Sequence, residues 1–355
     1  MTSNTGAVDG LLAGLPTRRS ASSGAGRTID LSVASARDYE WLVRPLLMAA
    51  ALFSGMVVAL VVGFVFWQAW PLWRSEGIRF LTSDGWDWQL ENAWNAGGVF
   101  FGALPLLVGS LLTTIGAVLV AFIVGMGASV FLAELAPGWI RHPMETVVQL
   151  LAGIPSVVFG LVGLFVVVPF ITDHVVPANA GEVVTEVPID GACLLAAIIV
   201  LSLMILPFFV TVATDSLRSV PRSFMDGGLA LGMTRWRTIT RLQVPSAAPG
   251  LIAGIVLAAA RAIGEAIAVS MVAGSLAFLP ALNHGPLYAL LMPVRTMASA
   301  IVESGAEASN VPSIAAAMFG LASVLLVFSL GLSLLARWAF ALFNRRMNID
   351  TGRRV

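Results

Sequence analysis

The sequence contains no lysine, and all 20 of its basic residues are arginine. A Walker A loop needs a lysine to reach the nucleotide phosphates, so the chain is not a conventional P-loop ATPase. Cysteine is nearly absent too: Cys193 is the only one, and no disulfide can form within the chain. The three histidines, His142, His174 and His284, are too far apart in sequence to resemble a metal-ligand motif. We therefore expect no metal site.

Charge is also scarce in this chain. Charged residues make up 11% of the 355 residues and hydrophobic residues 58%, whereas a soluble domain is about one quarter charged. The apolar residues form long runs with few charges, and a membrane-spanning helix needs about 20 such residues. We therefore predict an all-α, polytopic membrane protein with six transmembrane helices, near residues 46–70, 104–132, 146–171, 191–214, 246–279 and 312–340.

The distribution of arginine predicts how these helices are oriented. Arginines gather in residues 1–44, in the loop 215–245 and near the C-terminus, and six crossings put these segments on one side. Because cytoplasmic segments are enriched in arginine, we predict that both termini are cytoplasmic. Residues 1–44, rich in small and polar residues, are expected to be a disordered tail. Residues 45–342 then form the membrane domain, and residues 343–355 form a second cytoplasmic tail.

A proline interrupts the third predicted helix early. Residues 151–156 read Leu-Ala-Gly-Ile-Pro-Ser, and Pro155 has no backbone N–H and disfavours helix at the preceding residue. One interpretation is a packing kink. The other is a broken helix whose freed amides face an anion, which makes Gly153, Pro155 and Ser156 candidate substrate-path residues.

Two opposite charges lie inside the fifth predicted helix. Arg261 and Glu265 are four residues apart, which places both on one face of a helix. A charge at the bilayer centre costs at least about 2.5–3.5 kcal/mol on insertion scales, so we expect the two side chains to contact each other or to line a wet cavity. Arginine binds oxyanions such as phosphate in a bidentate manner, which predicts a substrate path at Arg261, Gly264 and Glu265. The alternatives are a cation path with Glu265 as ligand and a structural ion pair.

The arginine-rich loop between the fourth and fifth predicted helices has the pattern of two short helices. The first covers residues 222–231 and ends at Gly232, and the second covers residues 234–244 and ends before Pro245. Small residues give this element a surface that another protein can approach closely; they are Gly227, Gly228 and Ala230. The alternative is an amphipathic loop held by its arginines on anionic lipid.

This loop resembles the EAA motif of the permeases of ABC importers. Asp226, Gly227 and Gly228 stand at the Glu-Ala-Ala positions, Gly232 is the motif glycine and Pro245 is the terminal proline. In that family the motif forms a coupling helix that docks in a groove of a separate ATPase subunit. The resemblance therefore implies that ATPase coupling involves Asp226, Gly227, Gly228, Gly232, Arg235 and Pro245.

Other stretches resemble the phosphate-specific branch of these permeases, and within it the PstC subunits more than their PstA paralogues; they are residues 109–114, 151–160, 261–265, 266–269 and 293–297. The resemblance covers most of residues 45–345. It implies a type I importer bundle in the bacterial inner membrane, and it implies a PstA-like permease, a PstB-like ATPase dimer and a PstS-like phosphate-binding protein as partners.

On this interpretation the chain is not an enzyme and binds no cofactor of its own. ATP and magnesium would belong to the partner ATPase. Two other functions remain open from the residues. One is a permease for another oxyanion, such as sulfate or molybdate, and the other is an ion-coupled secondary transporter that works alone.

Overall fold

The computed structural model describes residues 37–86, 101–185, 187–280, 285–308 and 311–347. These residues are predominantly helical and contain no strand beyond an isolated bridge between Gly274 and Val294. Six described segments are helical, long and apolar enough to cross a membrane, which confirms the predicted all-α class and helix number. They are Val43–Ser75, Leu104–Leu135, Ser156–His174, Leu194–Arg218, Arg235–Ile263 and Pro312–Leu335.

The chain divides into two compact units, residues 1–58 and 59–355. In the first unit, residues 37–58 are described and form the first part of α1 (Arg37–Ser75). Helix α1 therefore begins inside the segment that was predicted to be a tail, and residues 1–36 lie outside the described residues. The last helix, α16 (Pro312–Met347), extends into the predicted C-terminal tail.

Helix α9 (Leu194–Arg218) lies at the centre of the second unit, and most of its residues are buried. Helix α4 (Leu104–Val130) packs along it, continued by the π-helical turn η1 (Phe131–Leu135). Two glycines of α4 allow this close approach, because a Cβ at Gly116 or Gly125 would collide with side chains of α9. The order of these contacts along both helices shows that α4 and α9 run parallel.

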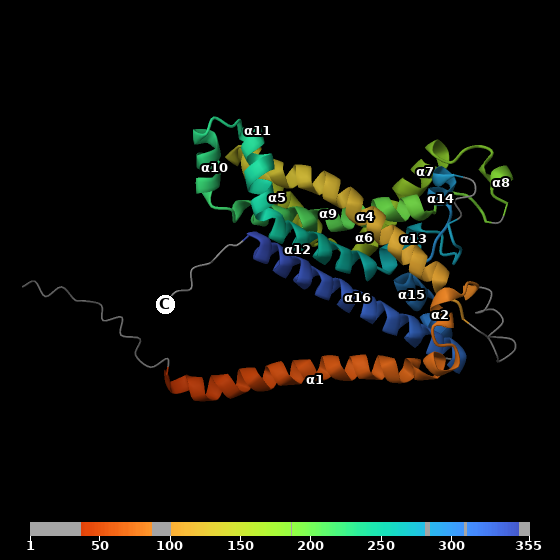
Figure 1. Ribbon diagram of the computed structural model, residues 1–355. Coiled ribbons are helices and arrows are strands. Elements are labelled where there is room, and N and C mark those ends of the chain that lie inside the picture. The colour runs from red at the N-terminus through yellow and green to blue at the C-terminus, as the bar shows by residue number, and fades with distance from the viewer. Residues whose placement is uncertain (1–36, 87–100, 186, 281–284, 309–310, 348–355) are drawn as a thin grey trace, which may run out of the picture. The chain divides into compact units, whose positions relative to one another are not determined.

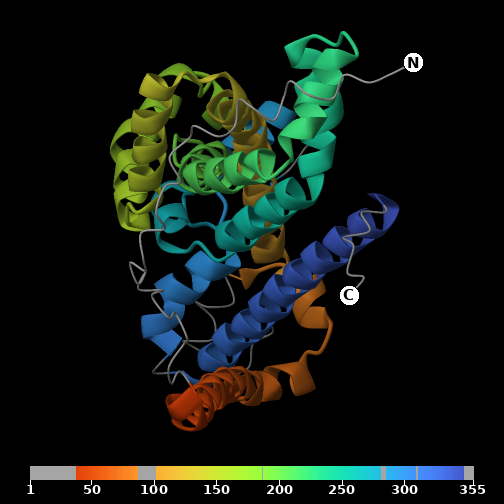
Figure 2. The ribbon, with the colours of Figure 1, turned by 90° about the vertical axis from the view of Figure 1, so that its left-hand side faces the viewer.

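Helix α12 (Val244–Ile263) packs on α9 in the opposite direction. A Cβ at Gly250 would collide with Ser216, near the end of α9, whereas one at Gly254 would touch Val212, a turn earlier. Helix α16 in turn lies along α12, as the dark blue and teal helices in Figure 2 show. The central helices of this unit are thus α4, α9 and α12.

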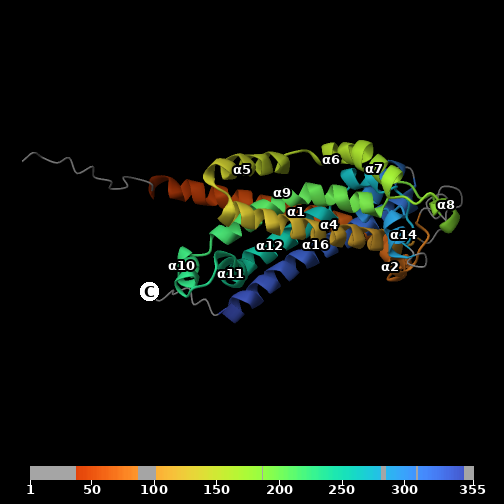
Figure 3. The ribbon, with the colours of Figure 1, turned by 90° about the horizontal axis from the view of Figure 1, so that it is seen from above.

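The predicted third helix is wrong as a single span over residues 146–171. Helix α5 (Gly138–Ala152) ends before the break, and a new helix begins at Ser156 as α6 (Ser156–Val162), which continues through η2 (Gly163–Val167) and α7 (Val168–His174). Figure 3 shows α5 and α6 end to end with a short non-helical link between them. The proline therefore breaks the helix completely and does more than kink it.

The predicted fifth helix, 246–279, is wrong at both ends. It starts earlier, because α11 (Arg235–Thr238), η3 (Ile239–Gln243) and α12 form one continuous span. Pro245 was expected to stop a helix but lies in the first turn of α12; the π-helical turn before it changes the hydrogen-bond register where proline lacks an N–H. The span also ends earlier, at Ile263, and a short helix α13 (Ile267–Val272) follows after three residues.

The short elements lie at the two ends of the bundle (Figure 1). At one end are α10 (Arg222–Ala230) and α11, and we call this the α10 end. Towards the other end are α2 (Arg79–Thr82), α8 (Ala180–Val183), α14 (Pro286–Leu291) and α15 (Met297–Ala308). The segment 281–310, which was expected to be a loop, therefore contains two helices in its described part.

Candidate functional site

Residues 222–238 form two short helices joined by a tight turn, and we call this element the α10–α11 hairpin. Gly232 follows α10 with a φ of 77°, in the left-handed region that favours glycine. The N–H of Gly232 donates to the Leu229 carbonyl at 2.9 Å, and that of Met233 donates to the Gly228 carbonyl at 3.1 Å. These bonds satisfy carbonyls at the end of α10, so the prediction that Gly232 ends this helix is confirmed.

The two glycines before this turn face different surroundings. A Cβ at Gly228 would lie 2.7 Å from Thr238 Cγ2 and 2.9 Å from Leu242 Cδ1, whereas a Cβ at Gly227 would meet open space. Gly228 therefore lets α10 pack on the chain's own α11 and η3. The predicted small surface for a partner is wrong at Gly228 for this reason, while Gly227 and Ala230 are exposed.

Large apolar side chains are exposed on the hairpin. Leu231 is 85% exposed and Trp236 is 62% exposed, and Phe224 and Leu229 are also exposed. Asp226 lies on α10 with an exposed side chain as well. An exposed cluster of this kind beside charged residues is typical of a protein-binding surface.

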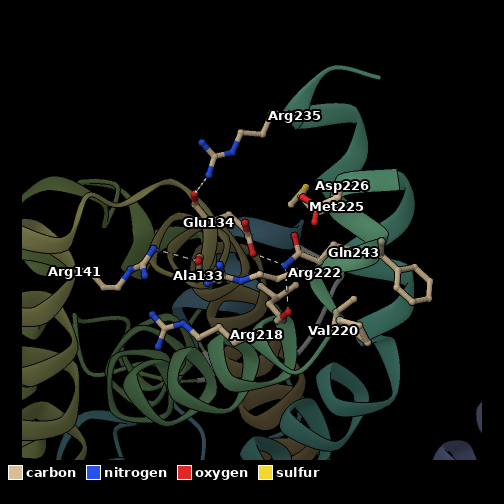
Figure 4. Close-up of a pocket in the computed structure, with 13 residues that line it drawn as sticks. Ala133, Glu134, Arg141, Arg218, Val220, Arg222, Met225, Asp226, Arg235 and Gln243 are labelled. Carbon is tan, nitrogen blue, oxygen red and sulfur yellow. Dashed lines mark hydrogen bonds between the residues drawn. The ribbon is translucent and has the colours of Figure 1, made fainter. Parts of the chain in front are cut away.

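A cavity of about 470 Å³ lies between the hairpin and the ends of α4, α5 and α9 (Figure 4). Four arginines line it, Arg141, Arg218, Arg222 and Arg235. Its other polar lining residues are two acids and one amide, Glu134, Asp226 and Gln243.

Three of these arginines cap the last carbonyls of η1. Arg218 donates to the Leu132 carbonyl at 3.1 Å, Arg141 donates to the Ala133 carbonyl at 3.4 Å, and Arg235 donates to the Glu134 carbonyl. Arg218 also forms an ion pair with Glu145 of α5. A helix leaves its last carbonyls without backbone partners, and cations favour that end of the dipole. The arginines therefore bind the end of α4 to three other elements.

Helices α6 and α13, which each begin after one of the two sequence breaks, lie side by side in the bundle. A Cβ at Gly160 of α6 would lie 3.1 Å from Ala268 Cα of α13, and one at Gly163 would lie 2.6 Å from Val272 Cγ1. Helices α6 and α13 are therefore parallel. Because each helix begins directly after a break, the 153–156 and 264–266 breaks precede the corresponding ends of two packed, parallel helices.

Arg261 and Glu265 do not pair with each other in the structure. Helix α12 ends at Ile263, so the helical spacing that would align the two side chains is lost. The Glu265 carboxylate instead accepts from the Ala268 N–H at 3.1 Å, at the start of α13. Arg261 is exposed, with its guanidinium carbon 5.9 Å from the centre of the Phe208 ring. Among the described residues, Arg261 has no carboxylate partner.

The more deeply buried ion pair lies in the segment that was expected to be a loop. Arg295 is 9% exposed, and its guanidinium lies 2.7 Å from the Glu303 carboxylate. It also donates to the Ser304 hydroxyl at 3.2 Å, while the Ser275 hydroxyl donates to Glu303 at 2.7 Å. The sequence did not predict this ion pair, because both residues lie outside the long apolar runs in which buried charges stand out. The available signal was the resemblance of residues 293–297 to the phosphate-specific permeases.

Two of the stretches singled out from the sequence pack together around this pair. A Cβ at Gly109 of α4 would lie 2.4 Å from the Arg295 carbonyl oxygen, so only glycine fits there. The Ser110 hydroxyl accepts from the Met297 N–H at 2.8 Å. These contacts bind residues 109–114 to residues 293–297.

Comparisons with known proteins agree with this architecture. Residues 125–349 match the family model described as "Binding-protein-dependent transport system inner membrane component". The chain is 41% identical over 203 residues to "Probable ABC transporter permease protein YqgH" of Bacillus subtilis (strain 168), which covers 57% of this chain and 60% of that protein.

A second relative matches over more of its length. "Phosphate transport system permease protein PstC" of Pasteurella multocida (strain Pm70) is 32% identical over 291 residues, which covers 79% of this chain and 86% of that protein. A solved bacterial ABC transporter for the acidic polysaccharide alginate has a TM-score of 0.49 at 16% identity, covering 84% of this chain and 96% of that one. The family match and the PstC relative show that this chain belongs to the family of inner membrane components of binding-protein-dependent transport systems.

Proposed function

We propose that this chain is the permease subunit of an ATP-driven importer of inorganic phosphate and forms half of its translocation path. The printed names of relatives such as the Pasteurella protein support phosphate as the substrate. The observation in this molecule that carries the proposal is Arg261, an exposed guanidinium within a membrane-spanning segment with no carboxylate partner among the described residues. A charge in that position is too costly to face lipid, so it lies against water, a partner or an anion.

The surroundings of Arg261 support an oxyanion path. The breaks at Gly153–Ser156 and Gly264–Ala266 interrupt helical hydrogen bonding before α6 and α13, which pack against each other in parallel. Freed backbone amides of that kind bind anions in other transporters with broken helices. Because Glu265 caps α13 and does not bind Arg261, the guanidinium remains available for a substrate oxyanion. Phosphate would be held by Arg261 together with the amides at the start of α6, beside Pro155 and Ser156, whereas the Gly264 and Glu265 amides already donate to the Ala262 carbonyl.

The α10–α11 hairpin is proposed to dock on a separate ATPase. Its exposed Leu231 and Trp236 would fill an apolar groove of that partner, and exposed Asp226 would meet a basic side chain. This role requires the α10 end to be cytoplasmic, in agreement with the excess of arginine there. ATP and magnesium would be bound by that subunit.

The complete transporter would contain four kinds of subunit. We propose a PstA-like permease as the second half of the path, a PstB-like ATPase dimer at the α10 end and a PstS-like phosphate-binding protein at the other end, in a bacterial inner membrane. ATP binding would favour one bundle conformation and hydrolysis the other, because each state of the ATPase binds one conformation more tightly.

Phosphate uptake tests the proposal. Cells that lack this permease are complemented with wild type, Arg261→Gln or Arg337→Gln, the last being an exposed arginine of α16 outside the proposed path. We expect radiolabelled phosphate uptake to fall at least about tenfold for Arg261→Gln, which is the effect of losing one charge-assisted contact, and to be normal for Arg337→Gln. Membrane levels and assembly are measured alongside by pull-down.

Two further measurements separate the alternatives. Excess unlabelled sulfate or molybdate should not compete with phosphate; strong competition would indicate a permease for another oxyanion. Purified chain in liposomes should carry no phosphate without an ATPase, and transport driven by an ion gradient would identify a secondary transporter. Equal uptake by wild type and Arg261→Gln would remove Arg261 from the path.

A further inference from the structure

Two of the three π-helical turns in the described part of the chain meet at the α10 end of the bundle. Glu134 belongs to η1, at the end of the α4 span, and Gln243 belongs to η3, at the base of the hairpin. The Gln243 amide nitrogen donates to the Glu134 carboxylate. We infer that this contact is the joint through which movement of the α10–α11 hairpin reaches the helices of the bundle, with Gln243 and Glu134 as positioning residues. The inference rests on the proposed function.

Gln243 ties three helical spans together. It is 6% exposed, and the same amide nitrogen that reaches Glu134 also donates to the Leu217 carbonyl of α9 at 3.1 Å. Its own backbone lies in the continuous helix from Arg235 to Ile263. One buried side chain therefore links the α4 span, α9 and the α11–α12 span, and a polar link of this kind holds a defined geometry where apolar contacts can slide.

The rest of the boundary between hairpin and bundle is largely open. Helices α10 and α11 pack mainly on each other and on η3, and the 470 Å³ cavity separates them from the ends of α4, α5 and α9. Arg235 crosses to the Glu134 carbonyl, so the second link ends on the same residue of η1 (Figure 4). Apart from the backbone connections through η3 and at residues 219–221, a force on the hairpin is thus delivered at Glu134 and Gln243, and the cavity leaves room for the hairpin to move.

The π-helical geometry suits a joint. A π-turn contains one residue more than the α-helical turn it replaces and can shift hydrogen-bond register at small cost, and such turns are frequent at functional sites. Among the described residues, none donates a hydrogen bond to the Oε1 atom of Gln243. It is therefore an acceptor that a neighbouring donor can engage when the hairpin moves.

The joint also lies on the helix that carries Arg261. From Gln243 to Arg261 the α12 span is continuous, and 18 residues at about 1.5 Å each correspond to about 27 Å. A displacement at the base of the helix is therefore carried as a rigid-body movement to the proposed substrate path. We therefore expect a change at Gln243 or Glu134 to alter the coupling between ATP hydrolysis and phosphate import, in addition to any effect on protein stability.

A charge-swap experiment tests this joint in the complete complex. The four proposed kinds of subunit are reconstituted in proteoliposomes, and the number of phosphate ions imported per ATP hydrolysed is measured for three variants. The first variant, Gln243→Glu, places a carboxylate against Glu134. The second, Gln243→Glu with Glu134→Gln, restores an amide–carboxylate hydrogen bond with donor and acceptor exchanged. The third, Gln149→Glu, makes the same chemical change at an exposed residue of α5 and is the matched control.

We expect Gln243→Glu to lower the import-to-hydrolysis ratio about tenfold, within the range of coupling energies for residues in contact, while assembly and ATP hydrolysis stay within about twofold of wild type. The double variant should recover part of the ratio, because the contact with residue 134 returns while the Leu217 carbonyl loses its donor, and Gln149→Glu should equal wild type. An unchanged ratio in Gln243→Glu overturns the inference. A lowered ratio also overturns the inference if the complex fails to assemble and the double variant does not recover the ratio, because that result indicates that Gln243 serves packing alone.

The outcome for the joint is separable from the outcome for the substrate. A wild-type complex that imports a different anion overturns the phosphate assignment only, since the same ratio can then be measured with that anion. A wild-type complex that imports phosphate with an unchanged ratio in the Gln243→Glu variant overturns the joint only.

Discussion

Buried Arg295 and partly buried Glu303 form an ion pair in a segment that composition alone would place outside the bundle. The Arg295 guanidinium bridges to Glu303 and Ser304, and Ser275, whose φ of 51° is rare for a residue with a side chain, donates to the same carboxylate. The pair thus holds the strained backbone at Ser275, just after α13, in place. Breaking such a pair leaves one charge buried without its partner.

Arg295→Gln or Glu303→Gln should therefore destabilise the protein by about 3–5 kcal/mol. The double variant Arg295→Met with Glu303→Leu should cost less than either single change, because no uncompensated charge remains. Thermal unfolding in detergent measures the effect, with the exposed Arg237→Gln as a control that should change nothing. A single variant with wild-type stability would show that water already solvates the pair.

At the residue scale the sequence could predict which charged residues are candidates for function, but only in part which partners their side chains contact. Arg261 could be found because it interrupts an apolar run, and the structure leaves its guanidinium without a carboxylate partner among the described residues. The four-residue spacing could not exclude a contact between Arg261 and Glu265, because excluding it requires knowing that α12 ends at Ile263. The stretch 293–297 pointed to Arg295 by resemblance, but its burial could not be predicted, because burial by helices distant in sequence leaves no mark on a short local window.

At the scale of elements, the α10–α11 hairpin depends on which glycine faces which surface. Gly228 is enclosed by Thr238 and Leu242, and Gly227 is open. The two positions are adjacent in sequence and chemically identical, so they form a natural matched pair for substitution.

Gly227→Ala should stabilise α10 by about 0.5–1 kcal/mol, because alanine restricts the unfolded backbone and nothing obstructs its Cβ. Gly228→Ala should displace α10 from α11 and η3, at a cost of about 1–3 kcal/mol. Hydrogen–deuterium exchange over residues 222–238 measures both, with slower exchange expected for the first variant and faster exchange for the second. Equal exchange in the two variants would contradict the packing described for Gly228.

The ends of elements were predictable where local chemistry decides them. Gly232 ends α10 because its left-handed backbone is a local property of glycine, and Pro155 ends α5 because the residue before it avoids helix. Pro245 behaves differently, since the π-helical turn η3 before it accommodates a residue without an N–H. The same residue type thus breaks one helix and is absorbed by another, and the sequence pattern does not distinguish the two cases.

At the scale of the whole molecule, the number of spans followed from the apolar runs, because lipid requires a continuous apolar length. The division of the third and fifth spans did not follow, because small residues at Gly160 and Gly163 let broken helices pack in pairs within the bundle. Orientation remains a prediction from the distribution of arginine, and the single cysteine offers a direct test of it.

Cys193 is completely buried, and burial raises the pKa of its thiol, so little thiolate is present at neutral pH. Wild type should therefore not react with a membrane-impermeant maleimide. In cells that lack the proposed ATPase, which would cover Leu231, Leu231→Cys should react only in inside-out vesicles, and Asn179→Cys should react only in intact, right-side-out cells; both positions are exposed. The reverse pattern would invert the predicted topology, and reaction of wild type would contradict the burial of Cys193.

The π-helical turn η3 also fixes how far the hairpin is rotated about the helix axis relative to α12. Each residue of an α-helix turns the chain by about 100°, so the additional residue in Ile239–Gln243 determines the direction in which the hairpin faces relative to Arg261. Deleting one residue there would leave every side chain of the hairpin and of the proposed path intact, yet turn one set against the other by roughly a quarter of a circle. Two intact surfaces would then be out of alignment, and the length of this one turn would decide whether they act together.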